Sequence, residues 1–346
     1  QEGIGAYDAV NLQQTYVGNS GQPETQFLHQ GNPDLKWEQS TTTGVGLDFA
    51  TLDNRLTGTI DYYYTKRKDL LFYTPTPGGF SAQAFWWVNL PGYVTNEGVE
   101  LGLNYSAIQG RKFTWNIGYN MSLIKNRVQD FNVTVNTGAV NGQGLSGAYA
   151  QTFANGYPLF TWKMPTFQGF DGNGNARYAA GGKDQLQGSA LPTFLAGLTN
   201  SFTWGRWNAS IFFNAVRGFY EYNNTANALF LKGSIKTAHN VNYTVANSPE
   251  NPNNPGSVST RFLEKGDFVR LSNASIGYSF NMKKSKVIKT LTVTASGQNL
   301  ALITQYSGLD PEVNIDHQIS GVPSRGFDYT GYPKPRTVTL GINVGF

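Results

Sequence analysis

"RTVTLGINVGF", residues 336–346, alternates apolar and small polar side chains without interruption. Val338, Leu340, Ile342, Val344 and Phe346 share one phase, whereas threonine, asparagine and glycine occupy the other. Successive side chains of a β-strand point to opposite faces. The pattern therefore predicts a strand with one bulky apolar face and one small polar face.

The same division recurs along the chain and predicts nine strands. "FTWNIGYNMSL", residues 113–123, splits as cleanly as the C-terminal stretch. The residues that share the apolar face in other segments are Val45, Leu47 and Phe49; Leu56, Ile60, Tyr62 and Tyr64; Val99, Leu101, Leu103 and Tyr105; Phe194, Leu198, Phe202 and Trp204; Trp207, Ala209, Ile211 and Phe213; and Leu291, Val293 and Ala295. Between Gly266 and Phe280 the phase changes after Leu271, which predicts a β-bulge or a segment above the membrane.

Composition excludes several classes of protein. Charged residues make up 14% of the 346 residues, against about 25% in an average soluble domain. The net charge of +4 is too small to predict nucleic-acid binding, and the chain has no cysteine for a disulfide scaffold or a thiolate zinc site. A mean hydropathy of −0.36 without a long apolar run excludes membrane helices. It is compatible with a β-barrel, whose lumen face is polar.

A soluble antiparallel sandwich would also alternate, but three features favour a transmembrane barrel. Many predicted strands reach ten residues or more, as tilted membrane strands do. The predicted connections alternate between short ones near 51–54, 108–112, 205–206 and 281–287 and long ones near 67–95, 125–190, 219–264 and 302–333. Outer-membrane barrels combine short periplasmic turns with long extracellular loops in this way.

The third feature is an aromatic belt. Large rings on the apolar faces lie within a few residues of a short turn or of the C-terminus: Phe49, Phe113, Trp115, Trp204, Trp207, Phe280 and Phe346. Such rings favour the membrane interface, so we expect them to contact lipid at one level of the wall. The small polar face would then line a lumen, and closure would pair every backbone edge.

The strand count indicates a larger barrel. Single-chain bacterial barrels usually have an even number of strands, whereas nine are predicted here. If the last strand ends in the periplasm, the strand near residues 41–50 descends from outside, and an ascending strand should precede Gln1. The first ten residues also lack the pattern of a secretory signal peptide. We therefore expect residues 1–40 to form an extracellular loop and residues 41–346 to supply barrel strands and loops.

Several motifs resemble one family over essentially the whole chain. They are "GNPDLKWE" (31–38), "DNRLTGTIDYYYTKRKDLL" (53–71), "NEGVELGLNY" (96–105), "GQGLSGAYAQ" (142–151), "LEKGDFVRLSNASIGYSF" (263–280), "GQNLALITQYSGLDPEVN" (297–314) and "PRTVTLGINVGF" (335–346). In this order they resemble the C-terminal barrel of SusC-like TonB-dependent outer-membrane transporters. The resemblance implies a barrel of roughly 22 strands around a plug domain. It also implies a SusD-like surface lipoprotein, TonB coupling through an N-terminal part that this sequence does not contain, and import of an oligosaccharide or peptide.

Signals for catalysis, metals or cofactors are weak, and we predict none of the three. Gly142, Gly144 and Gly147 have the G-x-G-x-x-G spacing, but no strand-to-helix unit surrounds them. "DGNGN" at residues 171–175 begins like a calcium loop, but position twelve is Gly182 instead of glutamate, which favours a β-turn. The three histidines have no metal-ligand spacing. The basic, aromatic run at residues 62–68 fits a strand that emerges through anionic lipopolysaccharide better than a nucleic-acid surface.

Loop aromatics are the candidate substrate contacts. Phe85, Trp86 and Trp87 lie in the first predicted long loop, Trp162 in the second, and Tyr220 and Tyr222 at the start of the third. Exposed rings suit the apolar faces of sugars or peptide side chains, although they could equally pack loops against one another or against a lipoprotein. The alternative functions are a passive porin-like or adhesin-like barrel and, more distantly, a soluble carbohydrate-binding or glycoside-hydrolase sandwich.

Overall fold

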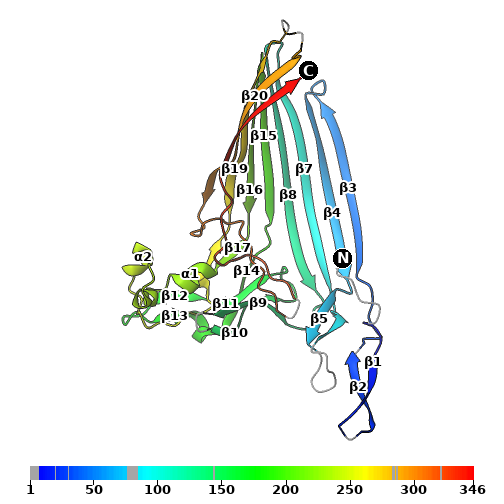
Figure 1. Cartoon of the computed structure of the whole chain (residues 1–346), viewed down its shortest axis with the longest axis vertical. Helices are drawn as coiled ribbons and strands as arrows, with labels where there is room; N and C mark the ends of the chain where they lie inside the picture. The colour runs from blue at the N-terminus through cyan, green and yellow to red at the C-terminus, as the bar shows by residue number, and fades with distance from the viewer. Residues whose placement is uncertain are drawn as a thin grey trace.

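The main body of the protein is a curved nine-stranded antiparallel sheet (Figure 1). The computed structural model describes residues 8–19, 21–29, 31–75, 85–142, 145–282, 285, 287–319 and 322–346. The strands of the wall are β3 (Gln39–Thr51), β4 (Leu56–Lys68), β7 (Tyr93–Gln109), β8 (Phe113–Gln129), β15 (Phe194–Trp204), β16 (Trp207–Arg217), β19 (Phe268–Phe280), β20 (Thr290–Thr304) and β22 (Thr337–Gly345). They neighbour one another in chain order, from β3 at one edge to β22 at the other. The nine predicted strands are thus confirmed, and they form a meander.

The connections alternate as predicted. Short ones (52–55, 110–112, 205–206 and 281–289) lie at one end of the wall together with the C-terminus, and long ones (69–92, 130–193, 218–267 and 305–336) lie at the other (Figure 1). Residues that tolerate a left-handed backbone shape the tight turns, such as Gly205 with φ 61° and Asn54 with φ 63°. The Arg55 guanidinium donates to the carbonyls of Ser106 and Ala107, which ties the first turn to β7.

A β-bulge interrupts β19 at Ser272, where the pairing with both β16 and β20 shifts by a residue. The Ser272 hydroxyl donates to Asn214 Oδ1 on β16. The extra residue returns Val269 and Leu271 to the face that carries Ile276. The irregularity predicted between Gly266 and Phe280 is therefore confirmed as a bulge.

The apolar face of the wall is uncovered. The register places Val45, Leu47, Leu340 and Ile342 on one face, and their exposed fractions are 70%, 62%, 79% and 71%. None of these side chains packs into either buried hydrophobic cluster, since both clusters lie in the loops and at the loop end of the inner face. A soluble sandwich would bury this face against a second sheet. We call it the outward face and the small polar one the inner face.

The predicted aromatic belt lies on the outward face near the short turns. Trp204 pairs with Phe113 on β8 and with Trp207 on β16. Trp115 shares this level, and its indole N–H donates to Asn200 Oδ1 at 3.1 Å. That bond gives a partner to the amide oxygen of Asn200, which lies on the outward face. The remaining predicted rings, Phe49, Phe280 and Phe346, also lie toward this end of their strands. Their contact with lipid stays a prediction.

The long connections, together with the described residues before β3, fold into small sheets and short helices at the other end of the wall (Figure 1). Their strands are β1 (Leu12–Val17), β2 (Pro23–His29), β5 (Leu71–Pro75), β6 (Phe85–Asn89), β9 (Val135–Gly142), β10 (Leu145–Phe153), β11 (Thr161–Pro165), β12 (Phe167–Phe170), β13 (Ala176–Tyr178), β14 (Asp184–Ser189), β17 (Tyr220–Asn223), β18 (Leu263–Lys265) and β21 (Phe327–Asp328). The helices are η1 (Ala179–Gly182), α1 (Asn224–Leu229), η2 (Lys232–Thr237), α2 (Tyr243–Ala246) and η3 (Thr260–Phe262). Among the described residues, none of these helices has the length and apolarity to cross a bilayer.

Candidate ligand-binding site

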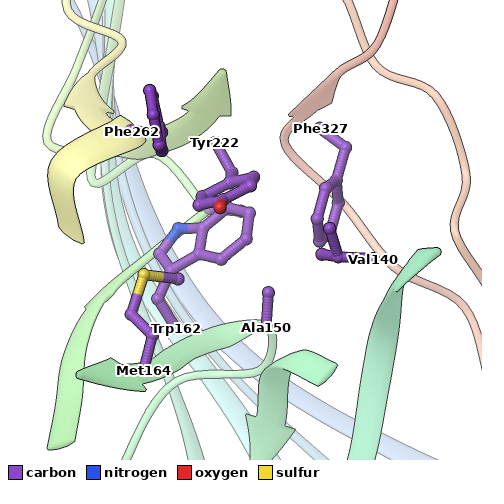
Figure 2. Close-up of a cluster of buried hydrophobic side chains, with 8 residues drawn as sticks. Val140, Ala150, Trp162, Met164, Tyr222, Phe262 and Phe327 are labelled. Carbon is purple, nitrogen blue, oxygen red and sulfur yellow. The ribbon is translucent and has the colours of Figure 1, made fainter. Parts of the chain in front are cut away.

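A buried aromatic cluster holds the loops together (Figure 2). Trp162 of β11, Tyr222 of β17 and Phe327 of β21 form its centre, with ring centroids 5.0 Å apart for Trp162 and Phe327 and 5.9 Å for Trp162 and Tyr222. Val140, Ala150, Met164, Ala190 and Phe262 complete it. The Trp162 indole N–H donates to the carbonyl of Tyr220 at 3.1 Å. The cluster thereby joins three long connections, 130–193, 218–267 and 305–336, into one unit.

This packing corrects part of the substrate-contact prediction. Trp162 and Tyr222 are 0% exposed, so neither is the exposed platform that was expected. Burial also raises the pKa of the Tyr222 hydroxyl. Tyr220 is half-buried and packs against the same cluster. These three rings join loops to one another, which was the alternative interpretation of their position.

The other predicted contacts lie in the β5–β6 hairpin. Trp87 is half-buried, and its ring stands 5.1 Å from that of Tyr73 on the opposite strand. The backbones of Phe85 and Trp86 belong to β6, but their side chains lie outside the described part of the structure. No described residue of this hairpin belongs to the aromatic cluster, so Trp87 does not share one site with Trp162 and Tyr222.

The sheet β18-β17-β21 has a second face that is acidic. Side chains alternate along β17, so Tyr222 points into the aromatic cluster while Glu221 and Asn223 point the other way. Glu221 pairs with Glu264 of β18, and Asn223 pairs with Asp328 of β21. Asp310 and Glu312, from the connection after β20, bring further carboxylates close to Glu221.

All but one of these carboxylates have partners. Glu264 accepts hydrogen bonds from Asn223 Nδ2 at 3.1 Å and from both the backbone N–H and the hydroxyl of Ser307 at 2.7 Å. Asp328 accepts from Tyr306 Oη at 2.7 Å and from Thr225 Oγ1 at 3.1 Å. Asp310 and Glu312 share a different partner. The buried Arg270 guanidinium lies 2.6 Å from Asp310 and 2.9 Å from Glu312.

Glu221 is the exception. It is 1% exposed, and within the described residues neither of its carboxylate oxygens has a hydrogen-bond partner. Burial, reinforced by Asp328, Asp310, Glu264 and Glu312, raises the pKa of Glu221 to about 10. Its carboxyl group is therefore protonated at neutral pH. Burial and the hydrogen bond to Asp328 likewise raise the pKa of the Tyr306 hydroxyl.

Beside this acidic face lies a cleft of about 630 Å³ that sequence reasoning did not find. Asn223, Thr225, Asn242, Thr244, Arg261, Glu264, Ser307, Asp328 and Thr330 supply its polar lining, and Ala226, Phe230, Val245, Phe262, Leu309 and Tyr332 supply its apolar lining. Tyr332 is 96% exposed. Apolar walls with a few placed polar groups are typical of small-ligand sites. The walls come from two connections, 218–267 and 305–336, that β19 and β20 separate in the sequence, so no local pattern signals the cleft.

A salt bridge braces the cleft wall. The Arg261 guanidinium makes two bonds of 2.7 Å to the two oxygens of Glu250, which is 2% exposed. The rings of Phe167, Phe170 and Phe262 surround the same guanidinium at 4.9–5.7 Å. Paired oxygens and aromatic faces thus fix the orientation of Arg261.

The described residues contain no group of three or more His, Cys, Asp or Glu arranged to hold a metal ion. In "DGNGN", Asp171 Oδ1 accepts from the backbone N–H groups of Asn173 and Asn175 at 2.9 and 2.8 Å, so the segment forms the turn predicted for it. In the glycine-rich motif, Gly142 ends β9 and Gly147 belongs to β10, whereas residues 143–144 lie outside the described structure. His317 packs against Phe327, and its Nδ1 lies 2.8 Å from the carbonyl of Ala139.

Comparisons with known proteins agree with this architecture. The family model described as "TonB dependent receptor-like, beta-barrel" matches residues 5–300. TonB-dependent receptor P3 of Formosa agariphila is 30% identical over 91% of this chain and 35% of its own length. TonB-dependent receptor SusC of Bacteroides thetaiotaomicron is 29% identical over 91% of this chain and 32% of its own length. The chain thus spans about a third of the length of these relatives.

A solved structure of the RagAB peptide transporter matches 99% of this chain and 39% of its own chain. The TM-score is 0.80 at 21% sequence identity. At this identity the likeness establishes the fold alone.

Proposed function

Because this chain belongs to the TonB-dependent receptor family and forms part of the β-barrel of such receptors, we propose that it is the C-terminal wall of an importer for a bulky nutrient. Receptors of this family lie in the outer membrane. The observation that carries the proposal is the uncovered apolar outward face, joined at one end to loops that fold into a packed unit with a large cleft. An outer-membrane importer needs both a lipid-facing wall and a folded entrance.

The proposed division of the chain follows from the same arrangement. The segment before β3, which begins at Gln39, includes the β1–β2 hairpin at the long-loop end (Figure 1), so we assign residues 1–40 to an extracellular loop that ends at the start of β3. Residues 41–346 supply the strands and the other loops. Strands outside this sequence would close the barrel around a plug, and an N-terminal part would contact TonB.

We assign ligand contact to the cleft beside the acidic face. Its exposed tyrosine, amides and hydroxyls suit an oligosaccharide or a peptide, the two cargo classes of the proposal. The relative named SusC and the RagAB peptide transporter support a SusC-type importer with a SusD-like lipoprotein over the loops. The proposed role is transport without catalysis.

Uptake by the full-length receptor tests the proposal. Cells that carry the receptor should accumulate a labelled oligosaccharide or peptide, and deletion of the receptor should abolish the signal. A protonophore should also abolish it, because TonB coupling draws on the proton gradient. Uptake that survives the protonophore would favour the passive porin-like barrel, and ligand bound at the surface without entry would favour the adhesin-like one.

Purification of the native complex tests the partner and the cargo class together. A SusC-type importer should copurify with a surface lipoprotein, and a ligand retained in the complex would be identified by mass spectrometry. A receptor that purifies alone from gently solubilised membranes would contradict the lipoprotein partner.

A further inference from the structure

Charged residues on the outward face of the wall gather at one level. Strand pairing places Lys66, Lys68, Glu97, Lys125, Arg127 and Arg217 outward, and every other outward position of the nine described strands carries an uncharged residue. All six lie at the long-loop end of their strands. Five are cations and one is an anion, so the outward face has a strongly basic border on this side.

Four of the cations form a compact group on β4 and β8, on either side of β7. Lys66 and Arg127 both pair with Thr95, and Lys125 pairs with Glu97 one row closer to the short turns. Neighbouring strands are about 4.8 Å apart, so Lys66 and Arg127 are separated by roughly 10 Å at the backbone. We call Lys66, Lys68, Lys125 and Arg127 the basic rim.

The basic rim lies at the level where hydrocarbon should end. On β8 the belt residue Trp115 and the rim residue Lys125 are ten positions apart, with only uncharged residues outward between them. Ten residues at about 3.3 Å each span about 33 Å along the strand, and a tilt of about 40° reduces the vertical distance to about 25 Å. An apolar band of about 25 Å is the height usual for outer-membrane barrels.

The positive charge of the rim is largely uncompensated. Lys125 contacts Glu97, the one acidic residue that faces outward in the described strands. The Lys66 ammonium stands 3.5 Å from the centroid of the Tyr93 ring, which attracts a cation without cancelling its charge. Neither Lys68 nor Arg127 forms an ion pair with another described residue, and both are exposed.

We propose that the basic rim binds the phosphate groups of lipid A in the outer leaflet of the outer membrane. Lipid A carries phosphates at the level of the headgroups while its acyl chains reach into the hydrocarbon. The rim and the apolar strand face below it match these two parts. A guanidinium and three ammonium groups can each make charge-assisted bonds to phosphate oxygens. The inference rests on the proposed orientation, with the long loops outside the cell, and is independent of the cargo.

Native mass spectrometry of the full-length receptor in detergent tests this binding. Hexa-acylated lipid A with two phosphates should remain bound to the unmodified receptor, and chemically dephosphorylated lipid A should be retained at least tenfold less. Phosphatidylglycerol at equal concentration should displace little of it. Equal retention of dephosphorylated lipid A, or full displacement by phosphatidylglycerol, would overturn the assignment.

Matched substitutions locate the surface. The triple variant K66Q/K68Q/R127Q should lower lipid A retention at least tenfold, whereas R67Q, which changes the inward-facing neighbour on β4, should leave it unchanged. K66R should retain binding. The heat-dependent shift of the barrel in gel electrophoresis reports the folding of each variant. K125Q changes the fourth rim residue alone, for comparison with the triple variant. Equal losses in R67Q and the triple variant would place lipid A elsewhere, as would unchanged retention in the folded triple variant.

Failure of this test and failure of the proposed function are distinguishable. Lipid A retention is measured on purified receptor without nutrient, TonB or a proton gradient. Uptake that depends on the proton gradient together with no lipid A retention would refute only the basic rim.

Discussion

At the scale of the residue, Glu221 is the least satisfied polar group near the proposed cleft. Its carboxyl group has an ordinary pKa of 4.5 and a pKa of about 10 in the folded chain. Below about pH 4.5 it is protonated whether the chain is folded or not, so it has little effect on stability. Between these values the unfolded chain ionises while the folded chain retains the proton, and the folded state loses stability as the pH rises.

Glu221→Gln should therefore stabilise the loop cluster at pH 7 by about 1 to 3 kcal/mol, because glutamine removes the cost of proton uptake that Glu221 carries on folding at this pH. The gain should shrink toward zero near pH 4. Hydrogen exchange of the β17 backbone in the full-length receptor measures it. Glu264→Gln is the matched control and should not stabilise, since Glu264 accepts hydrogen bonds from Asn223 and Ser307. A Glu221→Gln variant that opens more readily at pH 7 would contradict the protonated state.

Tyr332 is the residue on which ligand contact can be tested most cleanly. Its ring lines the cleft and is 96% exposed, so its removal should cost little stability. Tyr332→Ala should weaken ligand binding by roughly five- to tenfold, which corresponds to about 1 kcal/mol or slightly more for one ring contact. Tyr243 is 83% exposed and does not line the cleft. Titration calorimetry that shows equal losses in Tyr243→Ala and Tyr332→Ala would remove the cleft from the ligand path.

The candidate site was only partly predictable at this scale. The sequence identified Trp162 and Tyr222 as special, but alternation cannot show that a loop ring is buried by a segment 100 or more residues away, as Phe327 buries Tyr222. The cleft was missed for the same reason. Contacts within a strand follow from a period of two, whereas contacts between loops depend on the complete fold.

At the scale of the element, the wall strands were predictable almost completely. Each strand repeats its pattern over nine or more residues, and the short turns carry residues such as Asn54 and Gly205 that accept a left-handed backbone. The change of phase in β19 marked its bulge for the same reason. The small strands from β9 to β14 were not predicted, because most are three to six residues long and depend on neighbours from distant segments.

One pair of substitutions tests the direction of the faces. Leu340→Arg places a charge on the outward face of β22 and should cost roughly 2 to 4 kcal/mol of folding free energy in lipid. Thr339→Arg, one position earlier on the inner face, should cost much less. Ile117→Arg and Asn116→Arg repeat the comparison in the middle of the wall. Urea titration of the full-length receptor in vesicles measures all four, and greater damage from the inner-face variants would invert the assignment.

At the scale of the whole molecule, the sheet has two unpaired edges. β3 pairs only with β4, and β22 pairs only with β20, among the described strands. In hydrocarbon each unpaired backbone group costs several kcal/mol, so an open sheet cannot be the membrane form. The relatives are far longer than this chain. We therefore expect further strands to pair with both edges, as the predicted larger barrel requires.

This requirement predicts that residues 1–346 alone will not insert into vesicles, whereas the full-length receptor will. Insertion is measured by resistance to added protease and by the heat-dependent gel shift of a closed barrel. The aromatic cluster lies within the loops and at the ends of the small sheets. It could therefore form in the 346-residue chain even where the gel shift is absent. That result would show that the loops fold independently of barrel closure. Protected, heat-modifiable strands from this chain alone would mean that the sheet closes on itself by pairing β3 with β22. In that case the larger barrel, and with it the space for a plug, would have to be abandoned.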